Sequence, residues 1–158
     1  MQHAPADPAT PSPAVHLYTM GFTRKSARQF FTQLIDAGVR RVVDVRLNNV
    51  SQLAGFTKRA DLEYFLQQIG QIGYVHLPEL APTQDLLDRY KKRGGSWAAY
   101  ETEFLQLMAE RRIEEQVSPE LLDGGCLLCS EPTPDRCHRR LVAEYLAEKW
   151  GTVTIQHL

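Results

Sequence analysis

Residues 125–139 decide the fold, and they read GCLLCSEPTPDRCHR. An apolar run ends in polar and reactive side chains at Cys129, a loop with two prolines follows, and Cys137 and His138 then open a helix. This order predicts a strand, a loop and a helix, with the reactive groups placed where the strand stops. In open α/β sheets, ligands bind beyond the carboxyl ends of the strands. The stretch therefore indicates both a fold class and the position of a site.

Four more short strands are predicted outside this stretch, at residues 16–20, 41–46, 73–78 and 152–155, with helical patterns between consecutive strands. Strands that alternate with helices indicate a mainly parallel sheet with right-handed crossovers and helices on both faces. We therefore predict one three-layer α/β/α domain over residues 15–158, with about five strands and the last of them at an edge. Residues 1–14 contain prolines at positions 5, 8, 11 and 13, and we expect them to form a disordered tail.

Composition excludes several classes of protein. The formal net charge of -1 gives no general attraction to nucleic acid or to an anionic membrane. The three cysteines all lie within residues 126–137 and make no disulfide framework, which favours a reducing compartment. No apolar run approaches the ~20 residues that span a bilayer, and residues 1–14 lack the apolar segment of a secretory signal. We expect a cytoplasmic protein with no membrane partner, and the oligomeric state stays open.

Polar side chains follow three of the predicted strands. They are Asp44 and Arg46, His76 and Glu79, and Cys129 and Glu131. Because the carboxyl ends of parallel strands meet at one edge of a sheet, we expect these groups to converge there with Cys137 and His138. The alternative is that these segments are polar only because loops are exposed.

Cys129 is the candidate nucleophile of this site. A thiol at a strand end that faces a helix N-terminus and basic side chains is favoured as the thiolate. His138 is expected to orient or deprotonate it, and Glu131 or Asp44 to assist. The alternative for a cysteine is a place in the core, and we expect that role for Cys126 because it lies inside the strand.

The candidate ligand-binding residues are Arg46, Arg139, Cys137, His76 and Glu79. Asp44 and Arg46 share a strand face, so they form either an anion site or a buried structural pair. With Thr133 or Asp135 as the N-cap, helical phase directs Cys137 and His138 to the core side and Arg139 toward a flank. There Arg139 either holds an anion or pairs with a carboxylate and braces the loop. His76 and Glu79 have the same two interpretations, since a lone histidine on a strand also fits a hydrogen-bonded core position.

A four-ligand zinc site at the cysteines and His138 would have suitable donor types. On a strand, however, Cys126 and Cys129 face opposite sides of the sheet, which argues against such a site. A dithiol redox centre is also disfavoured, because its nucleophilic cysteine belongs at a helix N-terminus, whereas residues 126–129 form an apolar strand. We therefore predict no cofactor, with a metal held by Cys129, Cys137 and His138 as the minor alternative. A cysteine-phosphatase loop is also disfavoured, because the six residues between Cys129 and Arg136 make the loop one residue too long.

Four segments together resemble the family called domain of unknown function 488. They are residues 18–21 (YTMG), 43–46 (VDVR), 74–80 (YVHLPEL), and Cys129-Ser130-Glu131 followed by Cys137-His138-Arg139. The resemblance runs from about Leu17 to the closing helix and implies a small α/β sandwich. Phe22 stands where many members have His, and residues 47–52 (LNNVSQ) replace a proline and a Ser-Arg pair, so no role of those family residues is carried over. The resemblance implies no reaction.

These patterns predict a small enzyme or ligand-binding domain with a Cys/His/Arg pocket for a small anionic ligand, phosphate-like or nucleotide-like. The alternative is a non-catalytic protein-interaction module in which the Cys-His-Arg cluster is structural. A nucleic-acid-binding module ranks third, because the chain has neither a basic balance nor a basic-aromatic stripe.

Overall fold

The computed structural model describes residues 14–50 and 55–158, so the predicted tail lies almost entirely outside the described residues. Five parallel strands form one sheet in the order β3-β2-β4-β1-β5. The strands are β1 (Val15–Gly21), β2 (Arg41–Asp44), β3 (Gly73–His76), β4 (Gly125–Cys129) and β5 (Val153–His157). The predicted edge position of β5 is confirmed, and the strand predicted over residues 41–46 ends two residues earlier, at Asp44.

Seven α-helices and two short 3-10 helices connect and cover the strands in the described ranges. The α-helices are α1 (Ala27–Ala37), α2 (Arg59–Gly70), α3 (Gln84–Lys91), α4 (Trp97–Arg111), α5 (Ile113–Gln116), α6 (Pro119–Leu122) and α7 (His138–Trp150). The 3-10 helices are η1 (Gly55–Thr57) and η2 (Pro78–Leu80). No helix in the described part of the chain has the length and apolar character needed to cross a membrane.

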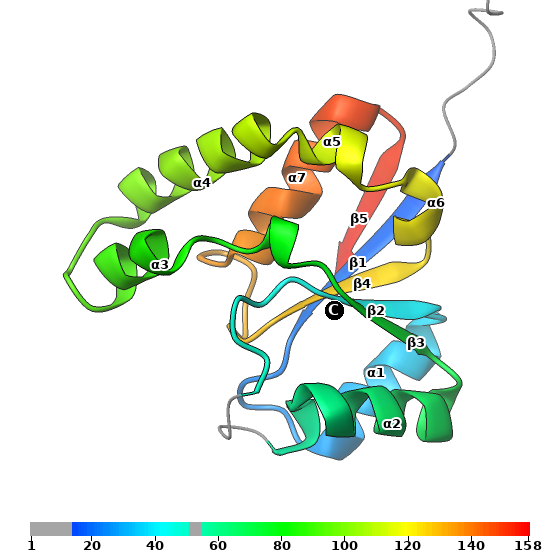
Figure 1. Ribbon diagram of the computed structural model, residues 1–158. Helices are drawn as coiled ribbons and strands as arrows, with labels where there is room; N and C mark the ends of the chain where they lie inside the picture. Colours follow the sequence, from blue (N-terminus) through cyan, green and yellow to red (C-terminus); the bar gives the residue numbers. More distant parts are fainter. Residues whose placement is uncertain (1–13, 51–54) are drawn as a thin grey trace, which may run out of the picture.

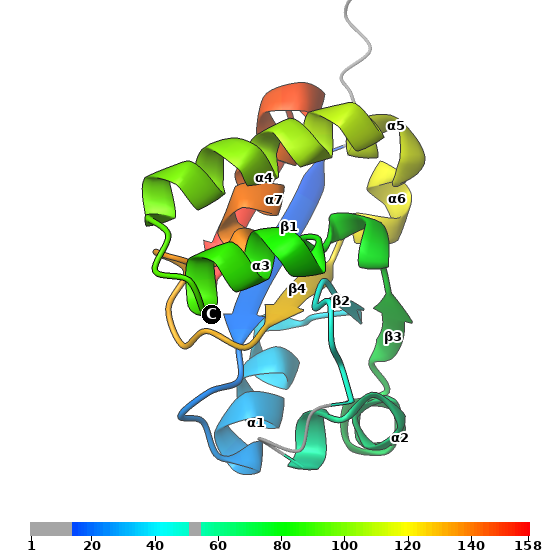
Figure 2. The same cartoon turned by 60° about the vertical axis from the view of Figure 1, so that its left-hand side comes forward.

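The helices form a layer on each face of the sheet, which confirms the three-layer α/β/α fold. Figures 1 and 2 show α1 and α2 below the sheet and the helices α3 to α7 above it. Each layer has its own apolar core: Phe30, Leu34 and Leu62 belong to the lower one, and Phe104 and Leu146 to the upper one. Burial of these two faces is the main favourable contribution to folding.

The central strand β4 is buried along its whole length and supplies both cores in alternation. Cys126 and Leu128 pack into the lower core, whereas Leu127 and Cys129 pack into the upper one. This is the period of two that a strand imposes on its side chains. The prediction that Cys126 and Cys129 face opposite sides of the sheet is therefore confirmed.

The position of β4 explains where a cavity can form. Strand β4 lies between β2 and β1 in the sheet. After β1 and β2 the chain continues to α1 and α2 on the lower face, whereas after β4 it continues to α7 on the upper face (Figure 1). Neighbouring strands whose connections diverge in this way leave a crevice at their carboxyl ends. Cys129 is the last residue of β4, so it lies at this crevice.

Candidate active site

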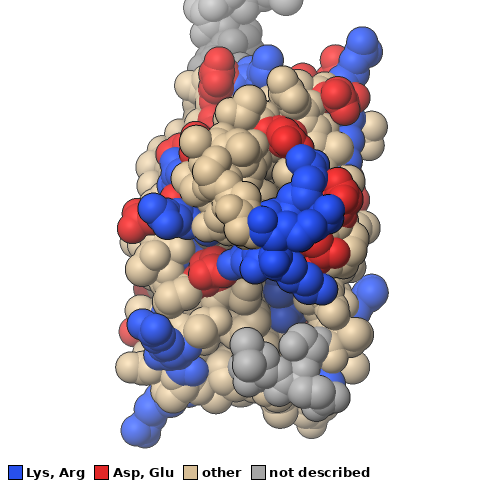
Figure 3. Space-filling model, turned by 90° about the vertical axis from the view of Figure 1, so that its left-hand side faces the viewer, with Lys and Arg blue, Asp and Glu red and all other residues tan. Residues whose placement is uncertain are grey.

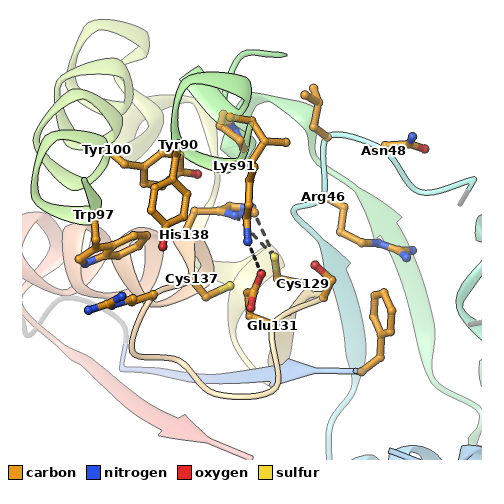
Figure 4. Close-up of a pocket in the computed structure, with 16 residues that line it drawn as sticks. Arg46, Asn48, Tyr90, Lys91, Trp97, Tyr100, Cys129, Glu131, Cys137 and His138 are labelled. Atoms are coloured by element: carbon orange, nitrogen blue, oxygen red, sulfur yellow. Dashed lines mark hydrogen bonds and ion pairs between the residues drawn. The ribbon is translucent and has the colours of Figure 1, made fainter. Parts of the chain in front are cut away.

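A cavity of about 280 Å³ lies beyond the carboxyl end of β4. It is lined by Phe22, Arg46, Leu47, Asn48, Pro82, Leu87, Tyr90, Lys91, Trp97, Tyr100, Cys129, Ser130, Glu131, Arg136, Cys137 and His138. Figure 4 shows the sulfur atoms and the imidazole together, with the rings of Tyr90, Trp97 and Tyr100 on one side and Arg46 and Asn48 on the other. The cavity thus places reactive groups next to apolar walls, the usual composition of a small-molecule site.

Cys129 is only 5% exposed, and its sulfur accepts several hydrogen bonds. The Cys137 thiol donates to it and lowers its pKa most strongly; the backbone amides of Ser130 and Glu131 lower the pKa further. The positive charge of Arg139 acts in the same direction, while burial opposes all of these contributions. The pKa of Cys129 lies below its ordinary value as a result, so its surroundings favour the thiolate.

His138 is held between the thiol and the backbone of the neighbouring strand end. Its Nε2 atom lies 2.7 Å from the carbonyl oxygen of Val45, and its Nδ1 atom lies 3.5 Å from the sulfur of Cys129. A carbonyl oxygen can only accept, so Nε2 carries the hydrogen and the neutral ring has its lone pair on Nδ1. Nδ1 is therefore oriented to take the proton of Cys129.

Cys137 is the N-cap of α7, which corrects the prediction of Thr133 or Asp135 at that position. Burial raises its pKa well above the ordinary value, and the interaction with Cys129 raises it further. Cys137 is therefore the protonated partner of the two. The sulfur atoms of Cys129 and Cys137 and a ring nitrogen of His138 all lie within 4.8 Å of one another, a spacing at which three donors could hold one metal ion.

Comparison with known proteins adds the family. The family model described as domain of unknown function DUF488 matches residues 26–146. The chain belongs to this family. No curated protein and no solved structure gives a significant match. The resemblance of the sequence to DUF488 is thus confirmed, and the matched segment contains every candidate site residue of the chain.

In this DUF488 domain, Asp44 and Arg46 form a buried ion pair. The carboxylate accepts from Nε of Arg46 at 2.8 Å and from Nη2 at 2.8 Å, and the hydroxyl of Tyr74 donates to it at 2.6 Å. The Nη2 atom also donates to the carbonyl of Thr57. Asp44 does not line the cavity, and the guanidinium of Arg46 points away from Cys129 (Figure 4). This arrangement matches the structural-pair interpretation and removes Asp44 from reach of the thiol.

Arg139 is fully buried, which corrects the prediction that it lies toward a flank of its helix. Its Nη1 atom donates to the carbonyl of Glu131 at 2.7 Å, and Nε lies 3.3 Å from the hydroxyl oxygen of Thr19. No carboxylate among the described residues forms an ion pair with it, and Nη2 has no hydrogen-bond partner there. Arg139 lies outside the cavity lining, so it braces the loop after β4 and adds positive charge behind Cys129.

The loop after β4 also depends on Gly21, the last residue of β1. A Cβ atom at this position would lie 1.5 Å from the carbonyl oxygen of Glu131, the oxygen that Arg139 holds. Only glycine allows the loop to approach β1 so closely. Gly21 and Arg139 thus fix the Ser130–Glu131 backbone, whose amides donate to Cys129.

Glu131 lies at the mouth of the cavity and forms an ion pair with Lys91 at 2.5 Å (Figure 4). Burial opposes the charged form of Lys91, but the pair with Glu131 outweighs it and raises the pKa of Lys91. Both side chains are about half exposed. The structure therefore places Glu131 at the entrance, and no contact joins its carboxylate to Cys129 or His138 within the described residues.

Besides Arg139, two predicted ligand-binding residues lie outside the cavity lining, His76 and Glu79. His76 contacts the carbonyl oxygen of Arg46 through Nε2 at 2.8 Å, so it supports the segment after β2. Glu79 lies in η2, and its carbonyl accepts from Arg111. Of the nine predicted site residues, the cavity brings together Cys129, Cys137, His138, Glu131 and Arg46.

The sequence interpretation missed the aromatic wall of the cavity. Tyr90 lies in the last turn of α3, and Trp97 and Tyr100 lie in the first turn of α4. The rings of Trp97 and Tyr100 stack at 5.2 Å between centroids. Burial raises the pKa of Tyr100 far above its ordinary value, so its hydroxyl stays protonated. Trp97 and Tyr100 are three residues apart, a helical spacing that favours core positions. The Gly94-Gly95 pair before Trp97 is a sequence signal that these aromatics lie near a helix end.

Proposed function

We propose that this DUF488 domain is a small enzyme in which Cys129 attacks a small anionic ligand bound in the cavity. The observation that supports it best is the geometry of His138, whose Nε2 is committed to Val45 and whose Nδ1 faces the thiol at 3.5 Å. A nucleophile, a base within reach and a third group that orients the base are the features of nucleophilic catalysis.

In the first step, His138 takes the proton of Cys129 at Nδ1, and the thiolate remains held by backbone amides. The thiolate then attacks the electrophilic centre of the ligand, and the imidazolium returns the proton to the leaving group. The hydrogen bond to Val45 keeps the ring in place through both transfers. Asp44 has no part in these steps, because its carboxylate is bound to Arg46 and Tyr74 outside the cavity.

The walls of the cavity suit a ligand with a flat ring and one anionic group. Tyr90 and Trp97 offer ring faces at the entrance, and aromatic side chains stack well on planar heterocycles. Lys91 and the exposed Arg136 line the same cavity, and Arg136 forms no ion pair with any described residue. A nucleotide-like ligand combines the two features.

The charge around the cavity supports a small anion over a long nucleic acid. On the side that carries α3, Lys and Arg side chains lie next to Asp and Glu side chains (Figure 3). Lys91 pairs with Glu131, and Lys92 with Asp88. These pairs neutralise part of the positive charge on this side of the described residues, and so weaken the counterion release that drives binding of a polyanion.

The first test is the reaction of each cysteine with iodoacetamide at neutral pH, followed by mass spectrometry. We expect Cys129 to be alkylated at least about tenfold faster than Cys126, because only the thiolate reacts and Cys126 is buried with a pKa raised to about 12. Equal, slow labelling of all three cysteines would contradict a nucleophilic role for Cys129.

The second test concerns the ligand. Adenosine monophosphate, ribose 5-phosphate and inorganic phosphate are titrated while the alkylation rate of Cys129 and the tryptophan fluorescence are followed. We expect the mononucleotide to protect Cys129 from alkylation most strongly, and this protection to weaken in Trp97→Ala. In the fluorescence measurement, Trp150 at the far end of α7 serves as an internal reference. Equal protection by phosphate alone would show that the ring plays no part in binding.

A metal centre is the second candidate, favoured by one distance. In a tetrahedral site with Zn–S of about 2.3 Å and Zn–N of about 2.0 Å, the sulfur and nitrogen atoms lie roughly 3.5 Å apart, which matches Cys129 and His138. The hydrogen bond from His138 to Val45 also resembles the support that metal-binding histidines receive. Metal analysis of protein purified without added metal decides between the metal centre and the nucleophilic cysteine. About one equivalent of bound metal per chain would favour the metal centre, and less than about a tenth of an equivalent would exclude it.

The interaction-module alternative expects the cysteine cluster to be closed and purely structural. The open cavity over the two sulfur atoms supports the enzyme proposal instead.

A further inference from the structure

Two of the three cysteines, Cys129 and Cys137, share the cavity. The sulfur atoms of Cys129 and Cys137 lie within 4.8 Å of each other, and both side chains line the cavity. Cys126 lies in the opposite core, on the other side of the sheet. The structure therefore singles out one pair of thiols and supplies the third as an internal control.

We infer that Cys129 and Cys137 form a dithiol–disulfide couple, which a small hydroperoxide entering the cavity oxidises. This inference takes the nucleophilic Cys129 from the proposed function and adds a second reaction at the same sulfur. It differs from the C-x-x-C pair that the sequence displays, because Cys126 cannot reach Cys129 through the sheet.

The first step has its groups in place. The thiolate of Cys129 attacks the terminal oxygen of the hydroperoxide, so a sulfur–oxygen bond forms and the oxygen–oxygen bond breaks. The departing alkoxide takes the proton from Nδ1 of His138 and leaves as an alcohol, and Cys129 becomes a sulfenic acid. His138 returns to the neutral form, and Nε2 still donates to Val45.

The second step uses Cys137. Its thiol displaces hydroxide from the sulfenic sulfur of Cys129, the proton and hydroxide leave as water, and the disulfide forms. Two molecules of a small thiol then reduce the disulfide and are themselves oxidised to a disulfide. The sum is one hydroperoxide and two thiols converted to one alcohol, one water and one disulfide.

The local structure permits the sulfur atoms to approach. The sulfur atoms of a disulfide are about 2.05 Å apart. Because the two sulfur atoms now lie at most 4.8 Å apart, each must move by little more than an ångström. Cys137 is an N-cap residue whose side chain makes no capping hydrogen bond, so its rotation leaves α7 intact. Its backbone is extended, with φ of -138° and ψ of 137°, and carries no strain that opposes the movement.

The experiment treats the full-length protein with one equivalent of hydrogen peroxide or tert-butyl hydroperoxide and measures the intact mass. We expect a loss of about 2 Da, for two hydrogen atoms, which dithiothreitol reverses. Trypsin cleaves after Arg112, Arg136 and Arg139, so the disulfide joins peptide 113–136 to peptide 137–139. Cys126→Ala retains the joined peptide, Cys129→Ser loses it, and Cys137→Ser gains about 16 Da at Cys129 instead.

Two outcomes separate this inference from the proposed function. In the first outcome, Cys129 of the unaltered protein is alkylated fast and gains oxygen, but no joined peptide forms. This result would overturn the dithiol–disulfide couple and would still support the nucleophilic role of Cys129. A joined peptide that persists in Cys129→Ser would overturn the couple by showing that Cys126 is the partner. Slow alkylation with no joined peptide would overturn both.

Discussion

The Nε2 atom of His138 lies 2.7 Å from the carbonyl oxygen of Val45. This contact links the first turn of α7 to the segment after β2, and it leaves Nδ1 free for Cys129. One backbone oxygen thus sets the hydrogen-bonding role of the imidazole, without the carboxylate that often orients a catalytic histidine.

Replacing His138 with Asn removes the proton acceptor of Cys129. We expect the alkylation rate of Cys129 at neutral pH to fall on the order of tenfold or more, because less of the thiol ionises. The rate is measured by mass spectrometry with iodoacetamide. His16→Asn is the matched control, since His16 is exposed and far from the cavity, and it should keep the original rate. An unchanged rate in His138→Asn would show that the amides alone activate the thiol.

The pH dependence of this alkylation should report the hydrogen bond from Cys137. The pKa of Cys129 is lowered, so in the unaltered protein the rate should rise with pH and level off below the range of an ordinary thiol. Cys137→Ala removes the strongest contribution and should move the midpoint to higher pH, whereas Cys137→Ser keeps a donor and should move it less. If both variants show the original midpoint, Cys137 does not activate Cys129.

Asp44→Asn tests the buried ion pair. The substitution leaves the charge of Arg46 buried without its counterion, and we expect the free energy of unfolding to fall by about 3–5 kcal/mol. Urea denaturation followed by circular dichroism measures this change. Lys92→Gln breaks the exposed pair with Asp88 and should cost less than about 1 kcal/mol. Equal, small costs for the two variants would mean that Arg46 finds another partner.

Gly21→Ala tests the close approach of β1 and the loop after β4. The added Cβ would collide with the carbonyl of Glu131, and we expect a loss of about 1–3 kcal/mol or more in stability. The Ser130 and Glu131 amides would shift with the loop, so the alkylation of Cys129 should slow as well. Gly55→Ala, where a Cβ meets no atom of the described residues within 4 Å, should leave both quantities unchanged. A stable Gly21→Ala with normal reactivity would show that the loop is not held tightly.

Much of this architecture follows from local sequence patterns. The alternation of β4 places Cys126 and Cys129 on opposite faces, and helical phase places His138 toward the core; both predictions are confirmed. Cys137 is buried as predicted, but as the extended N-cap residue before α7. These features depend only on the geometry of one element. The DUF488 match, over residues 26–146, spans β4 and most of α7.

The remaining features depend on contacts between elements, which local patterns do not contain. No local sequence pattern predicts that β4 lies between β1 and β2, although this strand order creates the crevice. Helical phase fixes the direction of the Cα–Cβ bond of Arg139, but its long side chain turns inward to Thr19 and the carbonyl of Glu131. Trp97 reaches the cavity only because α4 packs beside α3.

Arg139 makes the fold sensitive to the chemical state of its own site. Unfolding transfers this buried guanidinium to water, and in the folded protein its positive charge lowers the pKa of Cys129 and so favours negative charge on that sulfur. A modification that neutralises the sulfur removes favourable charge from the folded state alone, whereas a bound anion adds it. The melting temperature therefore reports both ligand binding in the cavity and modification of Cys129. A library of anionic compounds can be screened by thermal shift before any reaction is known.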